Sequence, residues 1–189
     1  MEIRDFSFDL PEHLIAQYPA EQRSGSRLLC LNSSSGEIQH NKFNDVLGYL
    51  NPGDLLIFND TKVIPARFFG EKETGGKVEL FLERLLSDNR LLMQVKSSKP
   101  LRSEMRLRIY RKNTEVIEDS LEAIVVGRSD QFYILQFDKS LQLKEQLFAH
   151  GYVPLPPYIK RVNESQDFDR YQTIYAENDG AVAAPTAGL

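Results

Sequence analysis

The stretch Asn51-Pro-Gly-Asp-Leu-Leu-Ile-Phe-Asn-Asp-Thr-Lys-Val-Ile-Pro-Ala-Arg67 decides how the chain is interpreted. Its Pro-Gly pair is typical of a turn, and residues 55–58 form a continuous apolar run that is too short for a helix. This run predicts a strand buried on both faces, as in a parallel sheet. Ligands usually bind at the C-terminal ends of such strands, where the sequence places Asn59, Asp60, Thr61 and Lys62.

The middle of the chain has a different sequence pattern. Short strand-like runs are separated by turn residues, and no helical period lies between them. Regularly spaced runs of this kind predict a small antiparallel barrel or sandwich. The six predicted strands are residues 64–71, 77–85, 91–97, 106–110, 121–126 and 132–137.

Mixed elements flank this all-strand region on both sides. Residues 27–31 and 38–42 predict a hairpin, and a helical pattern after Asp138 ends at His150, just before Gly151. Residues 154–158 are too rich in proline for a helix and predict a polyproline II segment. Spacings of i, i+3 and i+7 then predict an amphipathic helix with an aromatic stripe made of Phe168, Tyr171 and Tyr175.

Helices on either side of an all-strand middle indicate an inserted domain. The predicted fold class is an α/β discontinuous domain interrupted by a small, all-β, antiparallel six-stranded unit. Residues 1–62 form the first part of the α/β domain, residues 63–139 the insert, and residues 140–189 the second part.

The composition is ordinary for a globular protein, with 41% hydrophobic and 26% charged residues. No apolar run approaches the roughly 20 residues of a membrane helix, and the N-terminus lacks a signal pattern. Cys30 is the only cysteine, which excludes an internal disulfide, and the histidines have no ligand spacing. We therefore expect a cytoplasmic protein with no membrane partner and no metal. A monomer is a separate expectation, because the sequence does not give the oligomeric state.

Basic residues are concentrated locally, although the net charge is −4. Between Lys96 and Lys112 there are seven basic residues and one acidic residue, Glu104. Such a face can contact an RNA backbone, or it can be merely solvated. The predicted RNA-binding residues are Lys96, Lys99, Arg102, Arg106, Arg108 and Arg111.

The quoted stretch, together with Pro154-Leu-Pro-Pro-Tyr-Ile-Lys-Arg161 and Gly180-Ala-Val-Ala-Ala-Pro-Thr-Ala-Gly-Leu189, resembles the S-adenosylmethionine:tRNA ribosyltransferase-isomerase family of queuosine biosynthesis. The resemblance extends from Asp5 to Leu189. It implies that the insert is a β-barrel and that the protein is a tRNA-modifying transferase and isomerase. S-adenosyl-L-methionine is the implied co-substrate, and the implied partner is a tRNA anticodon loop that carries 7-aminomethyl-7-deazaguanine.

The implied reaction moves and isomerises the ribosyl group to give epoxyqueuosine, with release of adenine and methionine. Within the matching motifs, the implied catalytic residues are Asp60 and Thr61. The implied substrate-binding residues are Asn59, Arg67, Tyr158, Arg161, Tyr175 and Thr186. From the residues alone, each has an alternative role. Residues 59–61 can be turn stabilisers and Arg67 a solvated cation. Tyr158 and Arg161 can belong to a domain connector, Tyr175 to the core, and Thr186 to a plain tight loop.

Chains of that family continue past the Pro-Thr-Ala-Gly-Leu motif, whereas this sequence stops within it, at Leu189. We therefore expect a truncated N-terminal part of the enzyme, inactive by itself. Two alternatives stay open, namely a non-catalytic RNA-binding barrel and a partial gene product without a function of its own.

Overall fold

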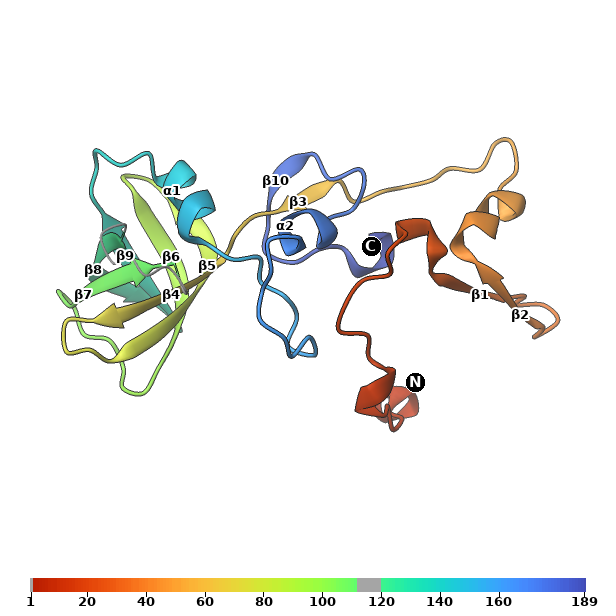
Figure 1. The fold of residues 1–189 in the computed structure, drawn as a ribbon, viewed down its shortest axis with the longest axis horizontal. Coiled ribbons are helices and arrows are strands. Elements are labelled where there is room, and N and C mark those ends of the chain that lie inside the picture. Colours follow the sequence, from red (N-terminus) through yellow and green to blue (C-terminus); the bar gives the residue numbers. More distant parts are fainter. Residues whose placement is uncertain (1, 112–119) are drawn as a thin grey trace.

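The structure is a computed structural model, which describes residues 2–111 and 120–189. A β-barrel lies at one end of an elongated molecule, short helices and a two-stranded sheet lie in the middle, and a hairpin lies at the other end (Figure 1). The 3₁₀ helices are η1 (Ile3–Phe6), η2 (Glu12–Leu14), η3 (Arg23–Gly25), η4 (Phe43–Tyr49) and η5 (Thr186–Gly188), and the α-helices are α1 (Leu143–His150) and α2 (Asp167–Arg170). The strands are β1 (Arg27–Leu31), β2 (Ile38–Lys42), β3 (Thr61–Val63), β4 (Arg67–Lys72), β5 (Lys77–Leu86), β6 (Arg90–Ser97), β7 (Arg106–Tyr110), β8 (Ser120–Ser129), β9 (Phe132–Phe137) and β10 (Asn178–Ala181).

The barrel is closed and antiparallel, with the strand order β4-β5-β6-β9-β8-β7. All six predicted strands are confirmed, and a barrel rather than a sandwich is the observed architecture. The predicted hairpin is confirmed as β1 and β2, paired from Arg27↔Lys42 to Leu31↔Ile38.

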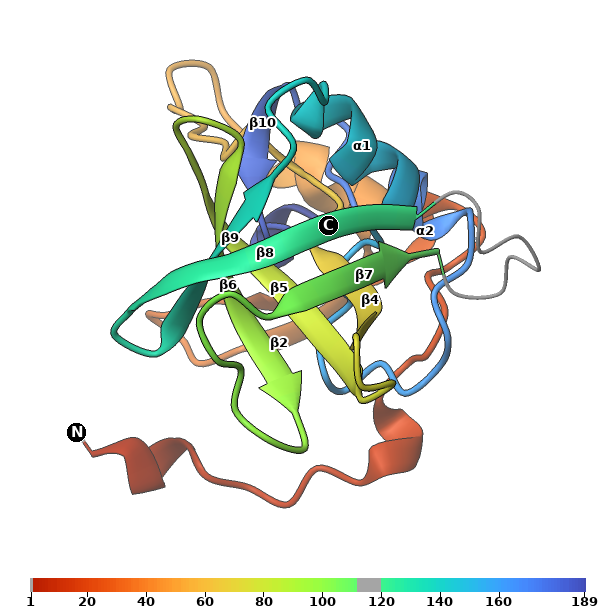
Figure 2. The ribbon, with the colours of Figure 1, turned by 90° about the vertical axis from the view of Figure 1, so that its left-hand side faces the viewer.

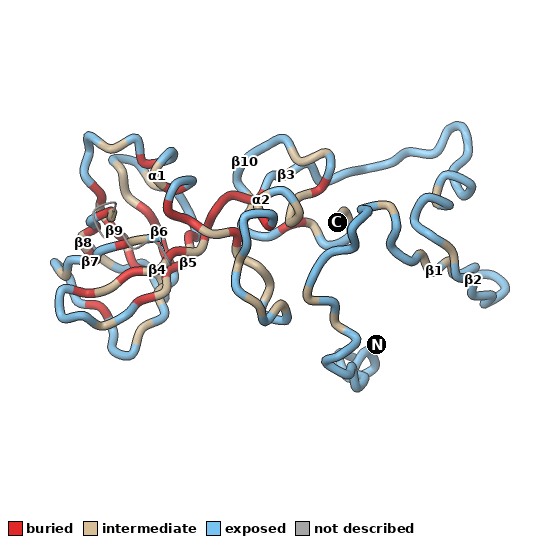
Figure 3. The backbone as a smooth tube through the Cα atoms, viewed as in Figure 1, coloured by how far each residue is buried: buried red, intermediate tan, exposed pale blue. Residues whose placement is uncertain are grey.

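The barrel is stabilised by a hydrophobic core, to which its strands contribute alternate residues. In β4 and β9 every second residue is buried, as expected for strands with one face toward a core and one toward solvent. Figure 2 shows the barrel from its own end of the molecule, and Figure 3 shows that most buried residues gather there. Leu143 and Leu147 of α1 belong to the same core, so this helix packs on the barrel.

The two parts of the chain that flank the barrel meet in a parallel strand pair. Thr61 of β3 lies opposite Asn178 of β10, and the Ile64 amide donates to the Ala181 carbonyl at 3.0 Å. A second small core, separate from the barrel core, consists of Val63, Val153 and Ala184. The discontinuous arrangement predicted for the fold is therefore present, while the exact boundaries at residues 63 and 139 stay a prediction.

The chain enters and leaves the barrel at one place. The Tyr152 amide donates to the Arg67 carbonyl at 2.8 Å, and the Arg67 amide donates to the Tyr152 carbonyl at 3.1 Å. Gly151, next to this bridge, has an extended backbone with φ of −82°, not the left-handed conformation common after helices. A Cβ at Gly151 would lie 2.6 Å from the Leu147 carbonyl oxygen, so close packing explains this glycine.

Two local predictions are wrong. Residues 55–58 are not a buried strand; they form no regular element, and Leu55 and Ile57 are 82% and 86% exposed. Asn59 and Asp60 therefore precede the nearest strand, β3, instead of following one. The aromatic stripe is also interrupted, because α2 ends at Arg170 and Tyr175 lies outside any helix. In the described part of the chain, no helix is long and apolar enough to span a membrane.

Candidate functional site

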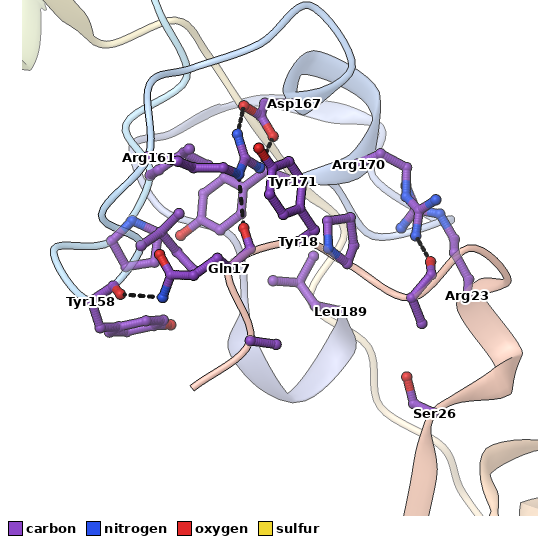
Figure 4. A pocket seen from close by; sticks show the side chains of 16 residues that line it. Gln17, Tyr18, Arg23, Ser26, Tyr158, Arg161, Asp167, Arg170, Tyr171 and Leu189 are labelled. Atoms are coloured by element: carbon purple, nitrogen blue, oxygen red, sulfur yellow. Dashed lines mark hydrogen bonds and ion pairs between the residues drawn. The ribbon is translucent and has the colours of Figure 1, made fainter. Parts of the chain in front are cut away.

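A cavity of about 260 Å³, the tyrosine cavity, lies between the N-terminal segment and the segment that follows the barrel (Figure 4). Its walls come from residues 16–26 on one side and residues 155–171 on the other, with Leu189 completing it. Its polar, charged and aromatic lining residues include Gln17, Tyr18, Arg23, Tyr158, Arg161, Asp167, Arg170 and Tyr171.

Gln17 fastens the N-terminal segment to the opposite wall. Its side-chain amide donates to the Tyr158 carbonyl at 3.0 Å and accepts from the Lys160 amide at 2.6 Å. Its own carbonyl accepts from Arg161 Nε at 2.7 Å. The two walls are therefore joined by hydrogen bonds between residues that are far apart in the sequence.

Arg161 and Asp167 form a bidentate ion pair in the cavity wall. Arg161 Nη1 and Nη2 donate to the two Asp167 carboxylate oxygens at 2.8 and 2.6 Å, and the Glu164 amide donates to the same carboxylate at 2.8 Å. The two side chains are only 12% and 3% exposed. Burial alone would raise the pKa of Asp167, but these hydrogen bonds together hold that pKa below its ordinary value. The pair is therefore charged at neutral pH.

Tyrosines line much of the cavity. The Tyr18 ring lies under the Arg161 guanidinium, with 4.5 Å between the ring centroid and Cζ, and its hydroxyl donates to Glu164 at 3.0 Å. That hydrogen bond raises the pKa of Tyr18, and burial raises the pKa of Tyr171. Both phenols stay neutral at physiological pH and present aromatic faces, which suit a planar or cationic ligand.

A second cavity of about 330 Å³, the arginine cavity, lies where the barrel meets residues 160–168. Arg67 and Phe69 of β4 line it from the barrel side, together with Arg111 and Tyr152. Lys160 and Arg161 line it from the other side. Arg161 borders both cavities, so the two lie next to each other.

Of the predicted substrate-binding residues, the structure brings Arg67, Tyr158 and Arg161 to these two cavities. Arg67 is held by Glu79, with Nε and Nη2 at 2.6 and 2.5 Å from the same carboxylate oxygen. Arg161 has most of its donors committed to Asp167 and to backbone carbonyls. Arg161 therefore shapes the walls more than it offers free donors.

The remaining predicted residues gather around the β3–β10 pair, not around either cavity. The Asn59 side chain accepts from the Thr61 amide at 3.0 Å and from the Thr61 hydroxyl at 2.5 Å, an Asx turn that starts β3. The Asp60 carboxylate accepts from Asn178 Nδ2 at 2.8 Å.

Tyr175 and Thr186 belong to the same small unit. The Tyr175 ring packs on Phe58 at 4.7 Å, and Thr186 begins η5. Among the described residues, Asn59, Asp60, Thr61, Tyr175 and Thr186 are absent from the walls of the tyrosine and arginine cavities. Their catalytic and binding roles stay predictions.

The predicted RNA-binding residues are all exposed, but several lie near carboxylates of neighbouring strands or turns. Arg106 lies 3.7 Å from Glu73, and Arg108 lies 3.9 Å from Glu71. Lys96 is the register partner of Glu79. Lys99 and Arg102 lie between β6 and β7, Arg111 reaches the arginine cavity, and Lys112 is outside the described residues.

Gln17, Tyr18 and Arg170 were not predicted from the sequence. Arg170 donates to the carbonyls of Ala20 and Glu21, which adds a further bond between the cavity walls. The only sequence signal for Gln17 and Tyr18 is a polar and aromatic segment around residues 17–23 that lacks helical or strand periodicity. Across residues 2–111 and 120–189, no cluster of three or more potential metal ligands is found.

Two comparisons with known proteins gave matches over most of the chain. A family model described as queuosine biosynthesis protein matches residues 3–189. A crystal structure from Thermotoga maritima, described as an S-adenosylmethionine tRNA ribosyltransferase, is 32% identical in sequence, with a TM-score of 0.37. That match covers 82% of this chain and 52% of the other, so this chain spans about half the length of that protein.

Proposed function

Because this chain belongs to the queuosine biosynthesis protein family, we propose that it serves in tRNA modification with S-adenosylmethionine as co-substrate. In the proposed reaction, the ribosyl group is transferred to 7-aminomethyl-7-deazaguanine in the anticodon loop and isomerised to epoxyqueuosine. Adenine and methionine are released. The family match across residues 3–189 is the observation that carries the proposal.

The tyrosine cavity is our candidate for binding S-adenosylmethionine. Tyr18, Tyr158 and Tyr171 supply aromatic faces on its walls. Such faces stack on an adenine ring, and they also attract a cationic group such as a sulfonium. The neighbouring Arg161–Asp167 pair holds two of these walls in place, so we assign Arg161 a positioning role.

Asp60 and Thr61 are the proposed catalytic residues, with Asp60 as acid or base or as the group that holds the ribose hydroxyls. An exposed carboxylate held by one amide can exchange protons with a substrate that approaches β3. We expect no catalysis by the 189-residue chain alone, because these side chains lie outside both cavities and residues 55–58 are uncovered. Monomeric state and cytoplasmic location stay predictions.

We expect Tyr158→Ala to weaken the binding of S-adenosylmethionine about tenfold, because one base–aromatic stacking contact contributes about 1–3 kcal/mol. Isothermal titration calorimetry of the chain with S-adenosylmethionine measures the change. Tyr49→Ala is the matched control, since Tyr49 is 48% exposed, close to the 47% of Tyr158, and lines neither cavity.

If Tyr158→Ala binds S-adenosylmethionine as tightly as Tyr49→Ala does, the co-substrate binds outside the tyrosine cavity. No binding of S-adenosylmethionine by the unmodified chain, together with tight binding of an anticodon stem-loop, would favour the non-catalytic RNA-binding function. Release of adenine by the chain alone, detected by chromatography, would contradict the expectation that it is inactive.

A further inference from the structure

The arginine cavity differs in chemistry from the tyrosine cavity beside it. Among the described residues, four cationic side chains line it, Arg67, Arg111, Lys160 and Arg161, together with one carboxylate, that of Glu164. They come from the barrel on one side and from the segment after it on the other. This concentration contrasts with the chain as a whole, whose net charge is −4.

The carboxylates that pair with these cations are not themselves on the cavity walls. Arg67 is held from behind by Glu79, and Arg161 by Asp167. The Lys160 ammonium pairs with Glu12, but that pair is 62% and 79% exposed. Exposed ion pairs contribute little and exchange readily with water or with another anion. The positive ends of these three pairs therefore face the cavity, and the exposed Lys160 ammonium can exchange Glu12 for an anionic ligand.

Aromatic surface accompanies the charge. The Phe69 and Tyr152 rings pack edge to face at 5.5 Å, and the Arg67 guanidinium lies 5.1 Å from the Phe69 ring centroid. Both aromatic residues belong to the cavity wall, which also includes Ser165. Cations placed beside aromatic rings and a hydroxyl are the groups that contact phosphates, sugars and unstacked bases in RNA complexes.

We propose that the arginine cavity binds backbone phosphate of an RNA strand, and thereby positions the nucleic-acid substrate beside the tyrosine cavity. A single carboxylate needs one arginine or lysine partner, whereas four cations on two sides suit the higher charge of successive phosphates. The inference rests on the proposed function for the identity of the RNA as substrate. The binding itself depends only on the cavity.

The test uses an anticodon stem-loop RNA and the variants Lys160→Gln and Arg111→Gln. Each should weaken binding about three- to tenfold and reduce the slope of log affinity against log salt by about one, as expected when one phosphate contact is lost. Lys77→Gln is the matched control, because Lys77 is also an exposed lysine paired with a glutamate, at 2.7 Å, but lies outside the cavity. Arg84→Gln is the control for Arg111, because Arg84 is also an exposed arginine but lies outside the cavity.

The controls should bind within about twofold of the unmodified chain, and Lys160→Arg should restore affinity. Equal losses in the controls would show diffuse electrostatic attraction and overturn the proposal. Methionine is the competitor for the other source of an anion, a carboxylate. If methionine binding, and not RNA binding, falls in the Lys160 and Arg111 variants, the cavity is a carboxylate site and the proposal is wrong.

Failure of this inference can be told from failure of the proposed function. RNA affinity that depends on Lys160 in a protein that does not bind S-adenosylmethionine would keep the phosphate site and remove the transferase assignment. If Tyr158→Ala weakens the binding of S-adenosylmethionine while Lys160→Gln leaves RNA affinity unchanged, the transferase assignment is kept and the phosphate site is removed.

Discussion

Replacing Asp167 with asparagine is expected to lower the free energy of unfolding by about 3–5 kcal/mol, the usual effect of removing one partner from a buried ion pair. The Arg161 guanidinium, 12% exposed, would lose its bidentate partner and remain charged. The same arginine bonds to the Gln17 carbonyl and stacks on Tyr18, so the tyrosine cavity should loosen as well.

Urea denaturation of the chain and of Asp167→Asn measures the effect. Asp169→Asn is the matched control in the same short helix, because Asp169 is exposed, and we expect a change within about 0.5 kcal/mol. Similar losses in both variants would mean that helix composition, and not the buried pair, determines the stability.

The pair also predicts a pH dependence. The pKa of Asp167 in the folded chain lies below its ordinary value of 3.8, because hydrogen bonding from Arg161 and Glu164 outweighs burial. The stabilisation is therefore fully present above pH 3.8 and is lost as the pH falls through the lower folded pKa. The difference in unfolding free energy between the chain and Asp167→Asn should shrink on acidification below that pH. A constant difference would contradict the assignment.

Gly151→Ala is expected to cost about 3 kcal/mol of stability. The new Cβ would lie 2.6 Å from the Leu147 carbonyl oxygen, 2.6 Å from Pro65 Cβ and 2.9 Å from Phe68 Cε1. None of these neighbours yields easily: one is helix backbone, one is a proline ring, and Phe68 is 1% exposed in the barrel core. Overpacking of this kind typically costs about 1–3 kcal/mol, here at the upper end because three groups are involved.

Thermal unfolding and urea titration of Gly151→Ala provide the measurement. Gly127→Ala is the control, since its nearest neighbour would be Ile134 Cδ1 at 3.8 Å, an ordinary contact. Alanine there should be neutral or stabilising by up to about 1 kcal/mol, through its effect on the unfolded chain. An unchanged Gly151→Ala protein would mean that the barrel exit can shift without cost.

The barrel could be predicted from the sequence because its strands obey a local rule. Residues alternate between core and solvent in β4 and β9, and turn residues separate the strands. Residues 55–58 follow no such alternation. Their apolar run indicates burial, but burial requires partners that no local pattern specifies, and the described residues leave this run exposed.

The residues of the two cavities were only partly predictable, because their walls also depend on contacts between distant parts of the chain. The Pro154–Arg161 motif indicated a site and does contribute Tyr158 and Arg161. The opposite wall comes from Gln17 and Tyr18, more than 140 positions away. It is joined by hydrogen bonds from Gln17 to the Tyr158 carbonyl and from Tyr18 to the Glu164 carboxylate. Nothing in the sequence pairs Arg161 with Asp167. The sequence therefore could not predict that the Arg161 guanidinium donates to Asp167 and not to a ligand.

The parallel pairing of β3 with β10 has a consequence for the order of folding. Asp60 and Asn178 are 118 positions apart, and bringing such distant segments together from an unfolded chain carries a large loop-closure entropy. The antiparallel barrel strands pair mostly with near neighbours in sequence and can form first. Once formed, the barrel already holds Arg67 beside Tyr152, which shortens the loop that remains to be closed. We therefore expect the barrel to act as the folding nucleus for the segments that flank it.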